Sequence, residues 1–248
     1  MADWVYGRNP VLEALRSGEG PEELLIQEEA RPAGPLAELL RLAGSREVPV
    51  RPAPRAELDR LARSAGGTGV HQGVVARLPD FRYVSLDEIL ASPVETAPLV
   101  VILDCLQDVQ NLGSLIRTAE AVGASGVVLP ERRAAGVTAA VRRASAGAVE
   151  HLRISQVGNL ARALETLKEA GLWTFGLAAD APTPCWEADL TGPAALVVGG
   201  EGAGLRRLVR ERCDVLLRIP MRGRVASLNT AVAGSIVLYE ALRQRGGR

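Results

Sequence analysis

The sequence is poor in the residues that build most metal and redox sites. Its 248 residues include only three cysteines and two histidines, His71 and His151. The cysteines, Cys105, Cys185 and Cys213, form an odd set with no Cys-x-x-Cys spacing. An odd number of cysteines without this spacing is typical of reduced thiols in a cytoplasmic protein. We therefore expect no metal site and a cytoplasmic location.

Long apolar segments are also missing. The longest, such as residues 99–103 and 194–198, have the length of a strand and are far shorter than the roughly 20 residues of a membrane-spanning helix. The first residues do not combine a basic segment with an apolar one, so we expect no secretory signal. The sequence predicts a protein without a membrane partner.

Lysine is almost absent. Lys168 is the single example, so arginine carries nearly all the positive charge. The formal net charge is zero, which argues against binding that depends mainly on long-range attraction to phosphates. Most arginine pairs are expected on solvated helix faces. Arg222 and Arg224 differ, since they lie in a glycine-containing segment close to Asn229. We expect these two side chains to contact phosphate.

Apolar spacing predicts a small α/β domain at residues 1–78. Helices are expected at 8–16, 36–42 and 58–62, and extended segments at 24–26, 48–50 and 73–78. Residues 79–98 contain three prolines and show weak periodicity. This segment is predicted to be a linker with one short helix at 86–90.

The remaining residues, 99–248, alternate apolar strand-like runs with helical patterns. Strands are expected at 98–103, 126–129, 152–154, 173–177, 194–198 and 215–219, and helices at 112–122, 137–145, 160–170, 205–212 and 229–243. This alternation predicts a mainly parallel sheet with helices on both faces. Ligands of such sheets bind at the carboxyl ends of the strands.

Several familiar sites can be excluded. A Walker phosphate loop needs Gly-Lys-Ser/Thr, and Lys168 lies in the middle of a predicted helix. The dinucleotide fingerprint fails because Leu205 stands where its third glycine would be. Nucleophilic hydrolysis needs a base beside serine or cysteine, and His71 and His151 lie far along the chain from the segments described next. His71 is expected to be structural or to contact RNA, and His151 to flank a strand at the surface.

Three unusual segments begin at predicted strand ends. The sequence has four asparagines, and two of them, Asn111 and Asn229, lie close to predicted turns. Between them lies the run Gly199-Gly200-Glu201-Gly202-Ala203-Gly204. Glycines let a flat ligand approach the main chain closely. A tight turn without a ligand would account for two of the glycines but not for Glu201 between them.

These segments resemble the three sequence motifs of the SpoU (TrmH-like) branch of the SPOUT methyltransferases. The matching residues are Asn111, Gly113 and Arg117 in motif 1, Gly199 to Gly202 in motif 2, and Ile219-Pro220-Met221 with Ser227-Leu228-Asn229 in motif 3. Residues 6–15 and 71–73 resemble the ends of the substrate-binding domain of the rRNA guanosine 2'-O-methyltransferases. Within the branch, the similarity is greatest to the bacterial enzymes that methylate a guanosine ribose in the peptidyl-transferase loop of 23S rRNA. One departure is Val109, where the family often has proline after the motif 1 aspartate.

The resemblance implies a small N-terminal α/β RNA-binding domain and a C-terminal α/β-knot domain, whose chain forms a trefoil knot. It also implies S-adenosyl-L-methionine as the cofactor, bound in a bent form. The residues matched to the cofactor site are Leu177, Gly199, Gly200, Gly202, Ile219, Met221 and Leu228. A homodimer is expected around the motif 1 helix and the final helix, with an active site that draws residues from both subunits.

The implied reaction is attack of a ribose 2'-hydroxyl on the methyl group of the cofactor. The family proposal assigns the hydroxyl proton to the motif 1 arginine, Arg117, but guanidinium does not normally deprotonate in proteins. Arg117 could instead hold a phosphate and stabilise the developing oxyanion, and both roles stay open. The other expected catalytic residues are Asn111, Glu201, Ser227 and Asn229. Large-subunit rRNA is the expected partner; the alternatives are a tRNA 2'-O-methyltransferase and a catalytically silent relative that binds rRNA.

Overall fold

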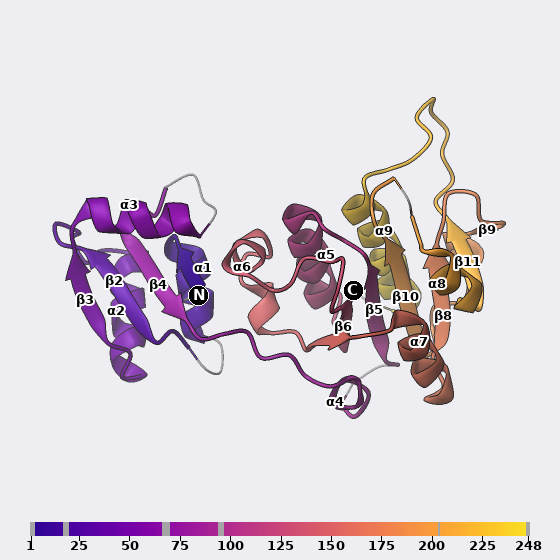
Figure 1. Ribbon diagram of the computed structural model, residues 1–248, viewed down its shortest axis with the longest axis horizontal. Coiled ribbons are helices and arrows are strands. Elements are labelled where there is room, and N and C mark those ends of the chain that lie inside the picture. The colour runs from indigo at the N-terminus through magenta and orange to yellow at the C-terminus, as the bar shows by residue number, and fades with distance from the viewer. Residues whose placement is uncertain (1–2, 17–19, 66–69, 94–96, 203, 247–248) are drawn as a thin grey trace. The chain divides into compact units, whose positions relative to one another are not determined.

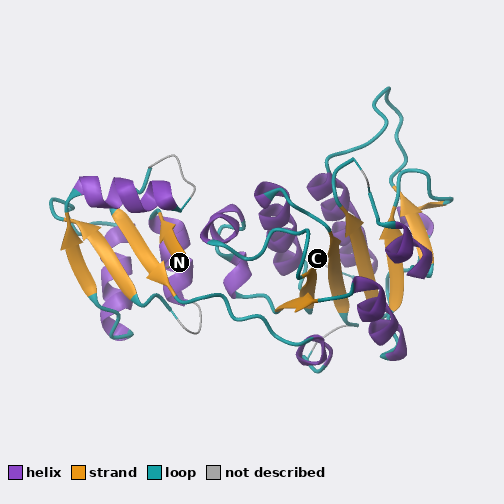
Figure 2. Ribbon diagram, in the orientation of Figure 1, coloured by secondary structure: helices purple, strands orange, loops and turns teal. Residues whose placement is uncertain are grey.

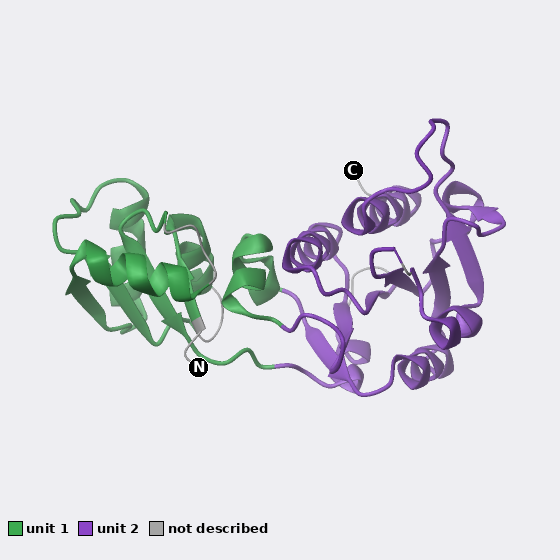
Figure 3. Cartoon of the chain, turned by 45° about the horizontal axis from the view of Figure 1, so that its top comes forward, with its two compact units in different colours: residues 1–82, 137–151 green, residues 83–136, 152–248 purple. Residues whose placement is uncertain are grey.

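The computed structural model describes residues 3–16, 20–65, 70–93, 97–202 and 204–246. The chain divides into two compact units (Figure 3). Unit 1 contains residues 1–82 and 137–151, and unit 2 contains residues 83–136 and 152–248. The expected division into 1–78, 79–98 and 99–248 did not include the return of residues 137–151 to the first unit.

Unit 1 is built on a four-stranded mixed sheet with the order β1-β4-β2-β3. In chain order its first elements are β1 (Asp3–Tyr6), α1 (Arg8–Arg16), β2 (Glu23–Gln27), α2 (Pro35–Ser45), β3 (Val50–Ala53), α3 (Arg55–Ser64) and β4 (Val74–Leu78) (Figures 1 and 2). β4 pairs antiparallel with β1 and β2, whereas β2 and β3 are parallel.

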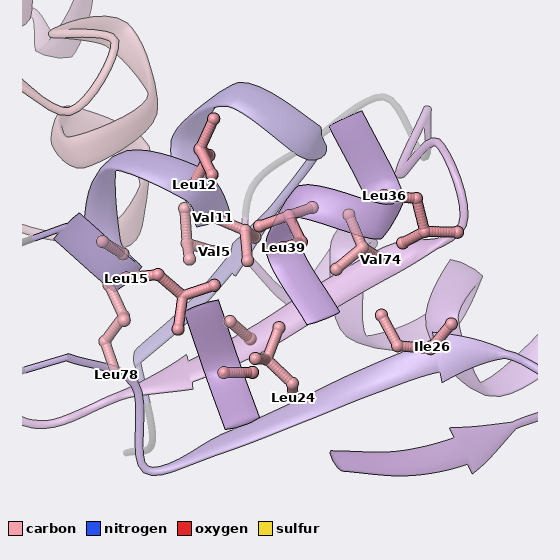
Figure 4. Close-up of a cluster of buried hydrophobic side chains, with 13 residues drawn as sticks. Val5, Val11, Leu12, Leu15, Leu24, Ile26, Leu36, Leu39, Val74 and Leu78 are labelled. Carbon is pink, nitrogen blue, oxygen red and sulfur yellow. The ribbon is translucent and has the colours of Figure 1, made fainter. Parts of the chain in front are cut away.

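Helices cover both faces of this sheet. Alternate residues of each strand point to opposite faces, so each face packs its own set of apolar side chains against the helices. Leu24 of β2 packs with Leu15 of α1 and Leu39 of α2 in the core drawn in Figure 4. The next strand residue, Leu25, packs on the other face against Leu58 of α3. The expected small α/β domain is therefore confirmed.

Residues 137–151 complete unit 1. They form α6 (Ala139–Ala144), which packs against β1, and the short helix η1 (Ala148–Glu150), which packs against α1. The guanidinium of Arg143 lies 4.6 Å from the centre of the Tyr6 ring, a cation–π contact. The close fit depends on Gly147, where a Cβ atom would lie only 2.4 Å from the Cβ of Glu13.

Unit 2 is built on a seven-stranded sheet with the order β7-β6-β5-β10-β8-β11-β9, in which every described pair is parallel. Its elements are α4 (Leu86–Leu90), β5 (Leu99–Asp104), α5 (Val109–Ala121), β6 (Gly126–Pro130), β7 (Ile154–Val157), α7 (Leu160–Glu169), β8 (Trp173–Leu177), β9 (Thr183–Pro184), η2 (Cys185–Glu187), β10 (Ala194–Gly199), α8 (Arg207–Arg212), β11 (Val215–Arg218) and α9 (Thr230–Gln244).

Both faces of the larger sheet are covered, which explains why its central strands are apolar throughout. All six residues of β5 are buried. Val100 and Ile102 pack with α4, α7 and α8 on one face, whereas α5 and α9 lie together on the other face (Figures 1 and 3). Gly234 permits the close approach of α9, because a Cβ atom there would lie 2.5 Å from the Leu115 side chain. The predicted parallel sheet with helices on both faces is confirmed.

The differences from the expected elements are small and local. β1 and the two-residue strand β9 were not expected from the sequence, because they are too short to show a period. The extended segment expected at 48–50 lies mostly before β3, which begins at Val50. Among the described residues, no helix is both long enough and apolar enough to cross a membrane.

Candidate active site

The three unusual segments follow β5, β10 and β11 and meet at the carboxyl ends of these strands, as expected. Asp104 ends β5, and after a short connection Asp108 begins α5 as its N-cap residue. The Asp108 carboxylate accepts a hydrogen bond from the main-chain N–H of Asn111 at 2.7 Å. This cap satisfies a free N–H group of the first turn. It therefore fixes the start of α5 although Val109 replaces the proline common in the family.

Asn111, Glu201 and Asn229 form one hydrogen-bonded cluster. The Nδ2 atom of Asn111 donates to Oε1 of Glu201 at 2.6 Å. The Nδ2 atom of Asn229 donates to the same carboxylate oxygen at 3.0 Å and to Oδ1 of Asn111 at 3.0 Å. The structure thus brings together three of the predicted site residues. Two amide donors hold one Glu201 oxygen, and the second carboxylate oxygen has no partner among the described residues.

Asn229 also begins α9. Its Oδ1 atom accepts hydrogen bonds from the main-chain N–H groups of Ala231 and Val232 at 2.9 and 3.2 Å. The amide oxygen is therefore committed to the helix, and the amide nitrogen is committed to the cluster. This double use fixes the orientation of the Asn229 side chain.

The glycine run forms a compact turn between β10 and α8. A Cβ atom at Gly199 would lie 2.2 Å from the main-chain carbon of Gly204, and one at Gly200 would lie 2.8 Å from the carbonyl oxygen of Cys105. Both positions are closed to larger residues by packing alone. Gly202 differs, because it has a φ of +73° and open space where a side chain would stand. Its conformation, rather than contact with neighbours, favours glycine.

A cavity of about 490 Å³ opens beside this turn, within the usual range for small-molecule sites. All the predicted cofactor residues line it, together with three predicted catalytic residues: Leu177, Gly199, Gly200, Gly202, Ile219, Met221 and Leu228, with Glu201, Ser227 and Asn229. Other lining residues, such as Ala178 and Arg218, were not predicted from the sequence. Their positions at the carboxyl ends of β8 and β11 could have indicated that they line the site.

The lining fits a flat ligand with hydrogen-bonding edges. The glycine turn presents main-chain groups without side chains in front of them, and Leu177, Ile219 and Leu228 supply apolar contact. No group of residues in the described parts of the chain has the composition of a metal site. These features match S-adenosylmethionine, whose adenine is planar and carries donors and acceptors on its edge.

A second hollow of about 490 Å³ lies on the outer side of α5 and α9. Its lining includes Asn111 and Asn229, so it adjoins the hydrogen-bonded cluster. Its α9 side carries Val232, Ile236 and Tyr239, which are 48%, 40% and 55% exposed. These residues are spaced by four and three positions and so form one apolar stripe along the helix.

Arg117, the predicted catalytic arginine, lies apart from the cavity of its own chain. It is exposed on α5, and no described residue forms an ion pair or hydrogen bond with its side chain. Its position continues the helical stripe of Gln110 and Ser114, which line the second hollow. Within one chain, the structure therefore does not bring Arg117 to Asn111, Glu201 and Asn229.

The cysteines and histidines offer no activated nucleophile. Burial raises the pKa of the Cys213 thiol to about 12, and it also raises the pKa values of Cys105 and Cys185. His71 is 4% exposed, and its Nδ1 atom accepts a hydrogen bond from the main-chain N–H of Gly73 at 3.0 Å. This contact supports a structural role for His71 in unit 1.

Two family profiles match the chain. The profile of the SpoU rRNA methylase family matches residues 98–239, and the profile described as RNA 2'-O ribose methyltransferase substrate binding matches residues 4–84. Together they span both the glycine turn with its asparagines and the smaller sheet.

Two curated relatives and one solved structure match this chain over nearly all of its length. The chain is 42% identical to a Bacillus subtilis protein assigned to the TrmH family of tRNA/rRNA methyltransferases, covering 98% of this chain and 96% of that protein. It is 41% identical to the 23S rRNA (guanosine-2'-O-)-methyltransferase RlmB of Pseudomonas putida, covering 97% and 96%. Among solved structures, the SpoU methyltransferase AviRb of Streptomyces viridochromogenes in complex with AdoMet matches with a TM-score of 0.81 and 29% identity, covering 99% and 91%.

Proposed function

The chain belongs to the SpoU rRNA methylase family and is an S-adenosylmethionine-dependent RNA 2'-O-methyltransferase, and we propose that its substrate is a guanosine of 23S rRNA. The identity to the Pseudomonas putida enzyme over nearly the whole chain supports this substrate. The main structural support for this function is that the glycine-lined cavity adjoins the Asn111–Glu201–Asn229 cluster, because Glu201 and Asn229 belong to both.

In this proposal the cavity holds the cofactor. Main-chain groups of the turn at Gly199, Gly200 and Gly202 would bind the adenine and ribose. The side chains of Leu177, Ile219, Met221 and Leu228, which line the same cavity, would pack against them. S-adenosylmethionine supplies a methyl group made electrophilic by its positive sulfur. Because the turn is already formed by packing, little conformational entropy is lost when the ligand binds.

The cluster orients the substrate ribose. Oε1 of Glu201 is held by two amide groups, so its other oxygen points in a fixed direction and can accept a hydrogen bond from a ribose hydroxyl. Ser227 lines the cavity beside Asn229 and can add a further hydroxyl contact. Such fixed donors and acceptors act without reorganisation during the reaction.

Arg117 is proposed to act in the site of a second copy of the chain. The apolar stripe of Val232, Ile236 and Tyr239 is exposed beside the second hollow, and a two-fold interface there would bury it. The same interface would carry Arg117 of each copy toward the cluster of the other. A guanidinium can clamp a phosphate and stabilise negative charge on the attacking oxygen.

Two further contacts with RNA are proposed. Arg222 and Arg224 are exposed in the segment that joins β11 to α9, and neither has an ion partner among the described residues. Met221, Ser227 and Leu228 of the same segment line the cavity, so the two arginines lie close to its rim and can hold phosphates next to the target nucleotide. Unit 1 is proposed to supply RNA affinity but no chemistry.

Mapping of ribose methylation tests the substrate. Total RNA from cells with and without the protein is compared at every 2'-oxygen, and the proposal expects one 23S rRNA guanosine to lose its methyl group. Loss of a tRNA methyl group instead supports the alternative substrate. An unchanged 23S rRNA map would contradict the proposed substrate.

A further inference from the structure

A buried carboxylate lies beneath the glycine turn that carries Glu201. Asp104 is the last residue of β5, and its side chain is 0% exposed. One carboxylate oxygen accepts a hydrogen bond from the main-chain N–H of Arg206 at 2.8 Å. The other accepts from Nε of the same arginine at 2.6 Å. Two charge-assisted bonds therefore join the end of β5 to Arg206, where the turn ends and α8 begins.

The next residue of the chain supports the other end of the turn. Cys105 has a φ of +60°, which is uncommon for a residue with a side chain. Its carbonyl oxygen lies 2.8 Å from the place where a Cβ atom of Gly200 would stand. Two consecutive residues, Asp104 and Cys105, thus contact the two ends of one turn.

The position of this turn determines the geometry of the site. Gly200 and Gly202 form part of the cavity wall, and Glu201 between them receives the hydrogen bonds of Asn111 and Asn229. A displacement of Arg206 relative to β5 would move all three residues of the wall together. In active sites, a displacement of about 1 Å can lower the rate about 10²-fold.

Stability alone is a weak explanation for this pair. Removing a carboxylate from water is costly, and a buried ion pair often contributes no more to stability than apolar residues of the same size. The Arg206 side chain is 42% exposed, so its charge is also partly screened by water. The strict alignment of two donors on one buried carboxylate favours a role in geometry.

We propose that Asp104 is a positioning residue, which acts through Arg206 to hold the turn, and with it Glu201 and the cofactor-binding glycines, in the conformation that the reaction needs. This inference rests on the proposed function of the cavity. It assigns no chemical step to Asp104 itself.

The test compares Asp104→Asn with a matched control, Asp214→Asn. Asp214 also accepts a main-chain hydrogen bond, from Thr174 at 2.9 Å, and pairs with Lys168 at 2.7 Å. It lies at the amino ends of β8 and β11, away from the cavity. Each variant is measured by thermal unfolding, by calorimetry with S-adenosylhomocysteine, by kcat for methyl transfer, and by hydrogen exchange of residues 199–206 in the cofactor-free protein.

For Asp104→Asn we expect faster exchange in the turn, about tenfold weaker binding of S-adenosylhomocysteine and about 10²-fold lower kcat. Asp214→Asn is expected to lose a similar amount of thermal stability while its binding and kcat stay close to those of the wild type. Equal binding, kcat and exchange in Asp104→Asn and the wild type would overturn the proposal, as would losses that follow thermal stability equally in both variants.

A second variant covers the case in which Asp104→Asn does not fold. Arg206→Lys retains the main-chain bond to Asp104 and the positive charge, but lysine cannot reproduce the directed Nε bond. For Arg206→Lys we expect faster exchange in the turn, weaker binding of S-adenosylhomocysteine and lower kcat, each by a smaller factor than in Asp104→Asn. Exchange and binding equal to those of the wild type would contradict the positioning role. If the wild type itself fails to bind S-adenosylhomocysteine, the proposed cofactor site is wrong, whereas the exchange rates still decide whether Asp104 holds the turn.

Discussion

The side-chain nitrogen of Asn229 lies 3.0 Å from the carboxylate of Glu201, although 28 residues separate them in the chain. Because the oxygen of the same amide caps α9, the start of that helix and the active-site cluster depend on one side chain. Substitutions at this position can therefore separate folding from chemistry.

Asn229→Ala is expected to lose both functions. Loss of the cap lowers the free energy of unfolding by about 1 kcal/mol, and loss of the amide donor lowers kcat. Asn229→Asp retains the cap but places a second carboxylate against Glu201, and repulsion between like charges raises the pKa of one of them. The activity of the aspartate variant relative to the wild type should rise as the pH falls, because protonation removes the repulsion. Wild-type activity of Asn229→Asp at pH 8 would contradict this role.

Gly202 tests whether the glycine turn binds the cofactor. Gly202→Ala places a side chain in open space at a φ of +73°, at a cost of about 1–2 kcal/mol. Gly171→Ala is a matched control, with a φ of +87°, open space and a position away from the cavity. We expect similar losses of stability in chemical denaturation, but weaker binding of S-adenosylhomocysteine only in Gly202→Ala. Equal binding by the two variants would argue against the proposed site.

Residues 137–151 contain a buried ion pair, and its arginine, Arg142, also donates to the carbonyl oxygen of Pro79 at 3.1 Å. Arg142 donates to Glu150 at 2.7 Å, and the two side chains are 5% and 13% exposed. Arg142→Ala breaks this buried pair and the hydrogen bond to Pro79, and should lower the free energy of unfolding by about 3–5 kcal/mol. Arg207→Ala breaks the exposed pair with Glu211 and should change it by less than about 0.5 kcal/mol. Similar effects of the two substitutions would contradict a stabilising role for the buried pair.

The Cys213 thiol should react very slowly in the folded protein. Burial raises its pKa from 9.0 to about 12, and only the thiolate is nucleophilic. At pH 8 its thiolate fraction should be about 10³-fold lower than that of an unperturbed thiol. Alkylation followed by mass spectrometry should therefore label Cys213 only after unfolding. Rapid labelling of the native protein would contradict the packing between α8 and β8.

Local patterns predicted most of the fold. The helix at 8–16 and the strand at 173–177 have the expected bounds, because strong apolar spacing coincides with clear breaks. Neither periodicity nor composition reports contacts between distant segments, so the return of residues 137–151 was missed. The trefoil knot rested on resemblance alone, since threading leaves no local signal, and it stays a prediction.

For the same reason, only part of the candidate site could be predicted from the sequence. Scarcity of asparagine pointed to Asn111 and Asn229, and an acid between glycines pointed to Glu201. Asp104 and Arg206 were not predicted to be a pair, because 102 residues separate them and each has an ordinary neighbourhood in the sequence. The pair can be recognised only in the folded structure, where the pairing of β10 with β5 brings the glycine turn next to Asp104.

We propose that the RNA methyltransferase site combines the cavity of one copy with Arg117 of another. The most direct test is methyl transfer to unmethylated 23S rRNA by Arg117→Ala, by Glu201→Gln, and by the two variants refolded together. Each variant alone should be inactive. In a mixed dimer, one site combines an intact Glu201 with an intact Arg117, so the mixture should recover about a quarter of wild-type activity. Activity of Arg117→Ala alone, or no recovery on mixing, would contradict the account.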